Sequence, residues 1–269
     1  MANFVGGLPG GDHATSGISI RSVDGANIDG VVISNVTMRN ACCPIFIRLG
    51  SRLRDRAPAP GSITNVLISN VIADNASWPC AIVGIPGCYP ENITLSNIRV
   101  TYAAGGPLAA RQSPVPEQGK QYPTANMFGT LPAYGLYCRH VKNLALSQVQ
   151  LLCSDQFTRL PLTGKRRNSY PYWQTPHTKL ERTTTDNPGT ALVAEDVLGF
   201  DIDSLQAQAG AKTDPVLQFI NVRDVFVHGC RAPAKTYVYL ELRGKATDGI
   251  RFEANDMDQA RKAIRRLRR

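Results

Sequence analysis

The stretch VVISNVTM at Val31–Met38 recurs along the chain and decides the fold. Counted from Ser34, the steps to its successive copies are 35, 27, 51, 56 and 25 residues. Self-similarity at such spacings is typical of solenoids, in which each repeat is one structural unit. The short steps fit one coil, and the long steps fit either a coil with an insertion or two coils with one unrecognised. The equivalent positions are Ser34, Ser69, Ser96, Ser147, Asp203 and His228.

A second apolar run precedes each copy, so the unit is strand, short turn, strand and loop. No single unit can bury its own apolar side chains, whereas a stack of units buries them in a continuous core. The pattern therefore predicts an all-β chain folded as a parallel β-helix of about six or seven coils with long side loops. The preceding runs are residues 17–21, 44–48, 80–84, 134–137, 191–193 and 215–219, and a further run follows at 236–240.

The asparagines that follow the repeated serines predict a side-chain ladder. In a parallel stack, equivalent residues lie about 4.8 Å apart, so Asn35, Asn70 and Asn97 can bond to one another through their amides. Asn35, Asn75 and Asn92 also begin Asn-x-Ser/Thr sequons. We favour ladder and turn roles over glycan attachment, because a strand-rich chain full of Asn, Ser and Thr produces sequons by chance.

Composition sets limits on the class of protein. The 269 residues are 43% hydrophobic, enough for one domain with a sizeable core. No apolar run reaches the length of about 18 residues that a membrane span needs, so no membrane span is expected. Residues 1–13 show neither the basic nor the apolar region of a secretion signal. Seven cysteines without a C-x-x-C spacing argue against a metal cluster; we expect mostly buried thiols, with a Cys80–Cys88 disulfide as the less favoured alternative.

The positive charge is concentrated at the end of the chain. The net charge is +9, and six of the 30 basic residues lie within residues 261–269. A basic tail of this kind gives no argument for nucleic acid as a partner of the whole chain. Met257, Ala260, Ile264 and Leu267 lie near helical spacing, which predicts a short amphipathic helix over 255–269 or a solvated tail. Binding of an anionic surface by the tail is the weakest functional hypothesis.

These signals divide the chain into three parts. We expect a flexible, glycine-rich leader over 1–16, a single β-helix domain over 17–250, and a basic tail over 251–269. Two long loops interrupt the domain, at 103–133 and at 154–190. The second loop places Tyr170, Tyr172, Trp173 and His177 among cations. Such a loop suits either the stacking of carbohydrate or the anchoring of the loop by its aromatic side chains.

Four segments carry a family resemblance: 17–25 (GISIRSVDG), 44–50 (PIFIRLG), 82–87 (IVGIPG) and 127–141 (MFGTLPAYGLYCRHV). They resemble the C-terminal half of bacterial glycoside hydrolase family 28 proteins, the polygalacturonase-like pectinases, over most of residues 17–245. The resemblance implies a right-handed parallel β-helix. It also implies inverting hydrolysis of galacturonan or rhamnogalacturonan linkages by a secreted or periplasmic protein, with neither a metal nor another cofactor.

The catalytic motifs of that family are absent from the sequence. Inverting hydrolysis uses two carboxyl groups about 6.5–9.5 Å apart, which the family takes from Asn-Thr-Asp and Asp-Asp segments beside a Gly-His-Gly segment. None of these strings occurs here. We therefore expect a truncated chain without its catalytic aspartates; the alternative is an inactive polysaccharide-binding or structural β-helix. Asp12, His13, Asp24 and Asp29 are weak candidates for a replacement pair, since turn carboxylates usually cap backbone groups.

Substrate-binding residues are more readily predicted. The resemblance places the family's Arg-Ile-Lys motif on Ser19-Ile20-Arg21, and one coil further Arg48 falls in register with Arg21. Two stacked guanidinium groups suit the carboxylate of a uronic acid; the alternative is a pair of solvated arginines. With Tyr134 from the 127–141 segment, the predicted substrate-binding set is Ser19, Arg21, Arg48 and Tyr134, and the predicted partner is an acidic polysaccharide. The oligomeric state stays unassigned, although we expect an open N-terminal end that aggregates or recruits a partner.

Overall fold

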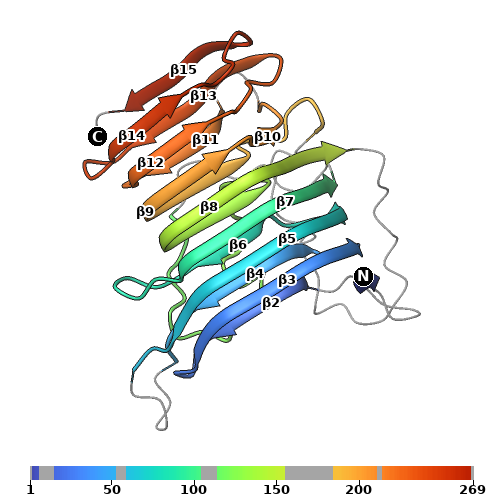
Figure 1. The fold of residues 1–269 in the computed structure, drawn as a ribbon, viewed down its shortest axis with the longest axis vertical. Coiled ribbons are helices and arrows are strands. Elements are labelled where there is room, and N and C mark those ends of the chain that lie inside the picture. Colours follow the sequence, from blue (N-terminus) through green and yellow to red (C-terminus); the bar gives the residue numbers. More distant parts are fainter. Residues whose placement is uncertain are drawn as a thin grey trace, which may run out of the picture.

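The computed structural model describes residues 2–5, 15–52, 59–103, 114–154, 184–210 and 214–267, with the backbone alone for 2–5. This part of the chain is all-β and forms one large sheet in which every strand pairing is parallel. Figure 1 shows the strands stacked from the N-terminal coils to the C-terminal ones. Within the described ranges there is no helix long and apolar enough to cross a membrane.

Two rows of strands make up the stack. The first row consists of β2 (Ser16–Ser22), β4 (Cys43–Leu49), β6 (Cys80–Val83), β11 (Pro215–Ile220), β13 (Thr236–Arg243) and β15 (Ala260–Leu267). The second consists of β1 (Ala2–Val5), β3 (Asn27–Arg39), β5 (Ser62–Ala76), β7 (Glu91–Ala103), β12 (Arg223–His228) and β14 (Asp248–Glu253). The long strands β8 (Leu136–Ser154) and β9 (Leu192–Asp203) contribute to both rows, and β10 (Gln206–Ala207) pairs with β8.

The register of the second row matches the repeat read from the sequence. Ser34 pairs with Ser69, Ser69 with Ser96, and Ser96 with Ser147. Ser147 then pairs with Asp203, which pairs with His228. The long steps of 51 and 56 residues are therefore single coils with insertions, and no coil lies unrecognised between them.

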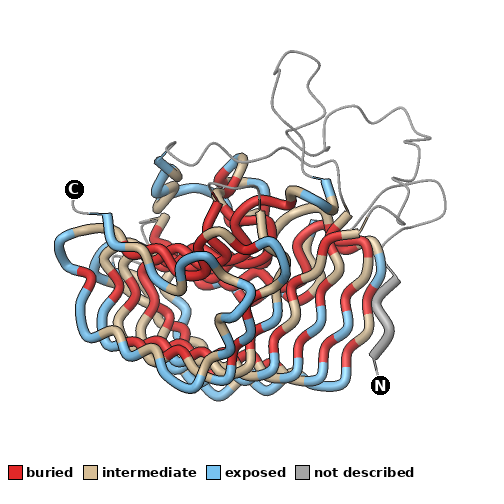
Figure 2. The backbone as a smooth tube through the Cα atoms, turned by 90° about the horizontal axis from the view of Figure 1, so that it is seen from above, coloured by how far each residue is buried: buried red, intermediate tan, exposed pale blue. Residues whose placement is uncertain are grey.

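The main core is built from both rows. Ile18 and Ile20 of β2 join Ile45 and Ile47 of β4, and the inward side chains of β3, β5 and β7 meet them. Buried and exposed positions alternate along the strands (Figure 2), as the period of two in a β-strand requires. The alternation places Ser19 and Arg21 on the outer, exposed face of β2.

The asparagine ladder is confirmed. The amide of Asn70 donates to the side-chain oxygen of Asn35 at 3.1 Å, and Asn97 donates to Asn70 at 2.8 Å. All three residues have φ between 51° and 58°, the left-handed conformation that asparagine tolerates better than most residues. Each of these asparagines therefore bends the strand within its own coil, and Asn70 and Asn97 each bond to the preceding coil.

The end of the described chain differs from the prediction. Instead of the amphipathic helix predicted over 255–269, residues 260–267 form strand β15, which pairs with β13. The apolar residues Ala260, Ile264 and Leu267 follow helical spacing and not a period of two, so the sequence pattern does not indicate this strand. The unpaired backbone edge of β13 favours the strand, since its N–H and C=O groups need partners.

The structure also bears on the predictions for the leader and for the cysteines. Residues 2–5 of the predicted leader form β1, which pairs with β3. All seven cysteines are free thiols and six of them are buried, so the alternative of a Cys80–Cys88 disulfide is wrong. The aromatic residues at 170–177 and the pair Asp12 and His13 lie outside the described residues.

Candidate functional site

Three arginines project from the outer face of the first strand row. Arg21 of β2 is in register with Arg48 of β4. Val83 of β6 follows in the same column, and Arg139 of β8 comes after it. The sequence-predicted register of Arg21 and Arg48 is thus confirmed, and the column extends further along the stack than the sequence indicated.

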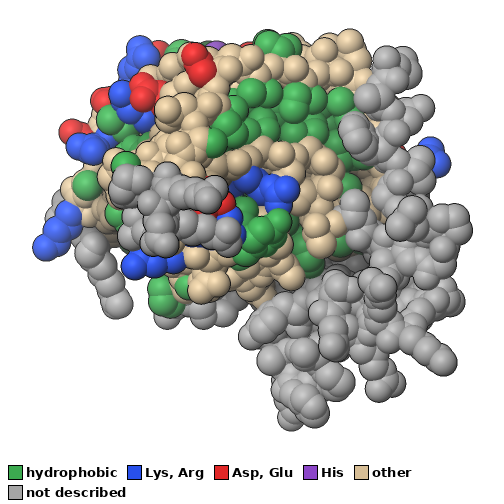
Figure 3. Space-filling view, turned by 90° about the horizontal axis from the view of Figure 1, so that it is seen from below, with side chains coloured by type: hydrophobic (Ala, Val, Ile, Leu, Met, Phe, Trp, Pro, Cys, Tyr) green, Lys and Arg blue, Asp and Glu red, His purple; other side chains and the backbone are tan. Residues whose placement is uncertain are grey.

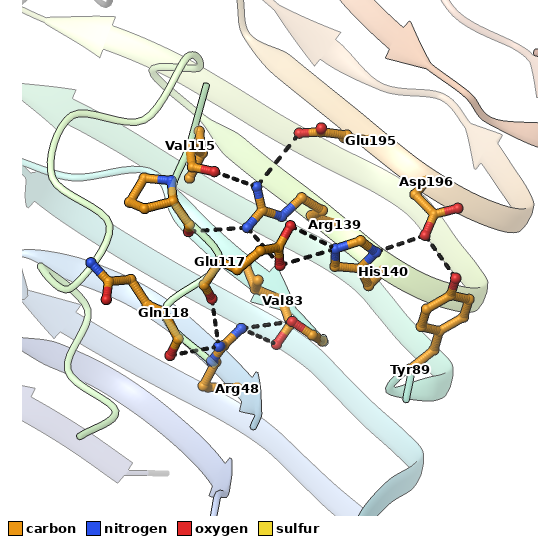
Figure 4. Close-up of polar contacts among 12 residues, drawn as sticks. Arg48, Val83, Tyr89, Val115, Glu117, Gln118, Arg139, His140, Glu195 and Asp196 are labelled. Carbon is orange, nitrogen blue, oxygen red and sulfur yellow. Dashed lines mark hydrogen bonds and ion pairs between the residues drawn. The ribbon is translucent and has the colours of Figure 1, made fainter. Parts of the chain in front are cut away.

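The arginine column binds the backbone of the segment formed by residues 114–123. Arg139 donates to the carbonyl oxygens of Val115 at 2.7 Å and Pro116 at 3.0 Å. Arg48 donates to Glu117 O at 2.9 Å and Gln118 O at 3.1 Å, and Arg21 donates to Pro123 O at 2.9 Å. The segment therefore crosses the coils in the direction opposite to their order, from β8 towards β2. Figure 4 shows its contacts with Arg139 and Arg48.

Burial decides the chemistry of Arg48. Its side chain is fully buried and also donates to the carbonyl oxygen of Gly84 at 2.7 Å. Its guanidinium carbon lies 5.1 Å from the centre of the Phe128 ring. Burial, followed by the positive charge of Arg139, lowers the pKa of Arg48 to about 10. Arg48 is therefore charged at neutral pH, and its guanidinium donates its hydrogen bonds to backbone carbonyl oxygens.

A second apolar cluster lies beneath the same part of the chain. Phe46 and Tyr137, which point outward from their strands, pack with Phe128 and Leu131 of the connection to β8. The first strand row is therefore buried on both faces along β4, β6 and β8. Hydrophobic burial and arginine–carbonyl bonds together fix the segment against the stack.

Carboxylates surround the buried end of the arginine column. Glu117 accepts from Arg139 at 3.0 Å, and Glu195 lies 3.9 Å from the other terminal nitrogen of the same guanidinium. The side chain of Glu117 is 49% exposed and that of Glu195 is 36% exposed. Tyr137 donates its hydroxyl to Glu195 at 2.9 Å. Two solvent-accessible carboxylates thus face each other across one buried cation.

His140 connects this group to the next coil. Its Nδ1 lies 2.6 Å from an Asp196 oxygen, and its Nε2 lies 3.2 Å from both oxygens of Glu117. Tyr89 donates to Asp196 at 2.7 Å and stacks on the His140 ring at 5.8 Å. Burial alone would raise the pKa of Asp196, but the hydrogen bonds from Tyr89 and His140 outweigh it and lower that pKa. Burial and the bond to Asp196 raise the pKa of Tyr89 to about 12.

The other end of the segment presents an accessible surface, which we call the Arg21–Tyr122 surface; it consists of Ser19, Arg21, Arg52 and Tyr122. Tyr122 is 61% exposed and directly precedes the proline whose carbonyl oxygen Arg21 binds. The guanidinium carbon of Arg52 lies 5.4 Å from the centre of its ring. Arg52 also forms an ion pair with Asp24, which fixes its orientation. Ser19 and Arg21 are exposed on β2.

The residues predicted from the sequence thus fall into two environments. Ser19 and Arg21 lie on the exposed surface, whereas Arg48 and Tyr134 are buried. Tyr134 packs in the main core and donates its hydroxyl to Leu151 O at 2.9 Å. The substrate-binding role assigned to these four residues stays a prediction.

The weaker carboxylate candidates have structural partners. Asp24 pairs with Arg52. Asp29 accepts from the side chains of Thr64 and Asn65, and the Asn65 bond, the larger effect, lowers the pKa of Asp29. In the described part of the chain, no group of three or more His, Cys, Asp or Glu side chains could hold a metal ion.

Sequence reasoning missed the cluster around His140, although a signal for it was present. The step of 56 residues that relates Ser147 to Asp203 also relates His140 to Asp196, so the repeat already placed these two side chains one coil apart. Glu117 and Tyr122 gave no such signal. They lie in the 103–133 loop, where no periodicity indicates which residues meet the strands.

Comparisons with known proteins give little further guidance. No family model matches the chain, and no curated protein matches it. Among solved structures, the chain is similar to a protein from Parabacteroides merdae ATCC 43184 that is described as a presumed glycosyl hydrolase. The match covers 91% of this chain and 79% of that one, at 11% identity and a TM-score of 0.32. A likeness at this level carries no argument, so the functional argument rests on the residues themselves.

Proposed function

We propose that the protein is a right-handed parallel β-helix of the polygalacturonase type that binds acidic, galacturonate-containing polysaccharide on its Arg21–Tyr122 surface. The observation that carries this proposal is the exposed Arg21, which is bonded to the carbonyl oxygen of Pro123, the residue that follows the exposed Tyr122. Arg21 uses one nitrogen to hold Pro123 O. Arg21 is exposed, and the other N–H groups of a guanidinium suit a carboxylate, which arginine binds through two parallel hydrogen bonds.

The neighbouring groups fit a sugar acid as well. An aromatic ring offers a broad apolar surface to the C–H face of a pyranose, and Tyr122 adds a hydroxyl that can donate or accept a hydrogen bond. Arg52, whose charge is paired with Asp24, holds the Tyr122 ring through a cation–π contact. The hydroxyl of Ser19, two residues before Arg21 on the same face of β2, supplies a further polar contact.

Binding is tested by titrating the chain with oligogalacturonate in a calorimeter. Arg21→Gln and Tyr122→Ala are each expected to weaken affinity about tenfold or more, because a hydrogen bond to a charged group contributes about 1.5–3 kcal/mol. Arg99→Gln is the matched control, since Arg99 is an exposed arginine on the outer face of β7. Equal affinities for the wild type and all three variants would overturn the proposal.

Hydrolysis of the bound polysaccharide is the second candidate function. Glu117 and Glu195 favour it, because they are two accessible carboxyl groups on either side of Arg139. Inverting glycosidases use two carboxyl groups about 6.5–9.5 Å apart, one as the acid and one as the base. The resemblance to polygalacturonase-like pectinases supports the same reaction class.

Release of reducing sugar from polygalacturonan and rhamnogalacturonan tests this second candidate. Hydrolysis by Glu117 and Glu195 predicts release by the wild type and its loss in Glu117→Gln and in Glu195→Gln. Asp258→Asn is the control, because Asp258 is an exposed carboxylate between β14 and β15, away from this pair of carboxylates and from the Arg21–Tyr122 surface. If the wild type releases no sugar but binds oligogalacturonate, the chain is a polysaccharide-binding β-helix without catalysis.

A further inference from the structure

A groove of about 850 Å³ lies on the last coils of the stack. Its lining comes from β8, β9, β12 and β14, and Arg266 of β15 completes it. This volume lies within the range of about 300–1,000 Å³ that is typical of small-molecule sites. The Arg21–Tyr122 surface shares no residue with the groove.

The parallel register forms one wall of the groove. Ala145, Asp201, Phe226 and Arg251 are equivalent residues on four successive coils, and their side chains follow one another along the outer face. The guanidinium carbon of Arg251 lies 4.5 Å from the centre of the Phe226 ring, and His228 stacks on that ring at 4.3 Å. Cation–π contact thus holds Arg251 in place without using its N–H groups.

Four charged side chains of the groove make no hydrogen bond or ion pair within the described residues: Asp224, Asp248, Arg251 and Arg266. A carboxylate only accepts hydrogen bonds, whereas a guanidinium only donates them. A hydroxyl group does both, so a ligand with neighbouring hydroxyls satisfies the two kinds of side chain together. The apolar part of the lining, which includes Ala145 and the edge of Phe226, suits the C–H groups of the same ligand.

The charged side chains that line the groove favour a neutral ligand over an acidic one. The lining holds three carboxylates, of Asp201, Asp224 and Asp248, against the two guanidinium groups of Arg251 and Arg266. His228 bonds to Asp201 at 3.2 Å and leaves the other two carboxylates to the ligand. The three aspartates do not form a group that could hold a metal ion. A uronic acid would meet this excess of carboxylates, whereas an uncharged sugar would not. We propose that the groove is a second saccharide site that binds neutral sugar units through paired carboxylate and guanidinium contacts.

This site does not depend on the Arg21–Tyr122 surface, so the two assignments can fail separately. The test titrates the full chain with galactotetraose and cellotetraose, followed by calorimetry and by NMR chemical-shift changes. Arg251→Gln and Asp224→Asn are each expected to weaken binding at least fivefold. Ala145→Phe, which fills the groove without changing its charge, is expected to abolish binding. Arg99→Gln and Arg21→Gln are expected to leave it unchanged.

The contrary results are equally definite. The assignment is overturned if neither neutral tetrasaccharide binds the wild type. It is also overturned if binding survives Ala145→Phe in a variant with an unchanged circular dichroism spectrum, or if Arg21→Gln removes it. Oligogalacturonate binding that depends on Arg21 would leave the proposed function intact in each of these cases.

Discussion

At the residue scale, equivalent arginines on adjacent coils have different roles. Arg21 is exposed and forms one bond to the backbone, whereas Arg48 is fully buried and donates to carbonyl oxygens of two separate parts of the chain. The difference arises because the 114–123 segment covers β4 and reaches β2 only at Pro123. A register column therefore does not by itself define a binding site; the covering segment determines which members stay accessible.

Removing Arg48 should destabilise the fold without a direct effect on ligand contacts. Arg48→Met leaves the carbonyl oxygens of Gly84, Glu117 and Gln118 without their donor. We expect the free energy of unfolding to fall by about 2–4 kcal/mol, since buried polar groups that lose their partner are costly. Chemical denaturation measures the change. Arg21→Met is the matched control, with an expected loss below about 1 kcal/mol; equal losses in the two variants would contradict the distinction between them.

The sequence reveals some site residues better than others. The outward face of Ser19 and Arg21 was predictable because the alternation of β2 sets it, whereas the role that the resemblance implies for them stays a prediction. Tyr122 and Glu117 were not, because their positions depend on where a loop of irregular conformation crosses the stack. Loop placement results from contacts with residues distant in sequence, and those contacts leave no periodic trace.

At the element scale, the asparagine column combines two properties that can be separated. Each asparagine has a positive φ, and each is bonded to its neighbour through its amide. Glycine retains the backbone freedom but removes the ladder, whereas alanine removes both. The column thus allows the conformational cost and the hydrogen-bond contribution to be measured at one position.

Asn70 is the position of choice, because it donates to Asn35 and accepts from Asn97. We expect Asn70→Gly to lower the free energy of unfolding by about 0.5–1.5 kcal/mol through the lost amide bonds. Asn70→Ala should cost about 1 kcal/mol more, because alanine in the left-handed region is strained. Denaturation with urea measures both values. An alanine variant as stable as the glycine variant would show that the positive φ contributes nothing.

The strand elements were more predictable than the end of the chain. The repeat of Ser34 predicted the register of five pairings, since burial of one face fixes the register of a strand. Residues 260–267 were predicted as a helix because Ala260, Ile264 and Leu267 follow helical spacing and do not alternate. The deciding factor was the unpaired edge of β13, together with the bond from Arg265 to the buried carboxylate of Glu241.

At the scale of the whole molecule, burial of thiols and phenols makes stability depend on alkaline pH. Burial raises the pKa of Cys80 to about 11, and it also raises the pKa of Cys138, Tyr134 and Tyr137. These groups stay protonated in the folded chain, whereas the unfolded chain loses its protons near pH 9 for cysteine and pH 10 for tyrosine. The stability they contribute is complete below pH 9 and is lost as the pH rises towards their folded pKa values.

This dependence gives a measurable slope. Between pH 9 and 11, each raised group lowers the free energy of unfolding by up to about 1.4 kcal/mol per pH unit. Urea denaturation across this range measures the sum of the contributions. Tyr134→Phe removes one titrating group. The free energy of unfolding should then fall less steeply with pH, whatever the substitution does to stability at pH 7. A slope unchanged by that substitution would mean that Tyr134 ionises equally in the folded and unfolded states.

The ends of the stack form a separate large-scale feature. Figure 3, the view from the side of β2 and β3, shows hydrophobic side chains gathered in a continuous area beside Lys and Arg side chains. Among the described side chains, Val32 of β3 is a prominently exposed apolar one, at 68%. The sequence-based prediction that this end associates with a partner stays a prediction; light scattering over a range of protein concentrations would test it.

The central claim is that the Arg21–Tyr122 surface recognises the carboxylates of a polysaccharide. The most direct test is to titrate the chain with an oligogalacturonate and with its fully methyl-esterified form, which has the same sugar backbone without the charges. We expect the acid to bind at least tenfold more tightly, and Arg21→Gln to abolish that preference. Equal affinity for the acid and the ester, or a preference that survives in Arg21→Gln, would contradict the account.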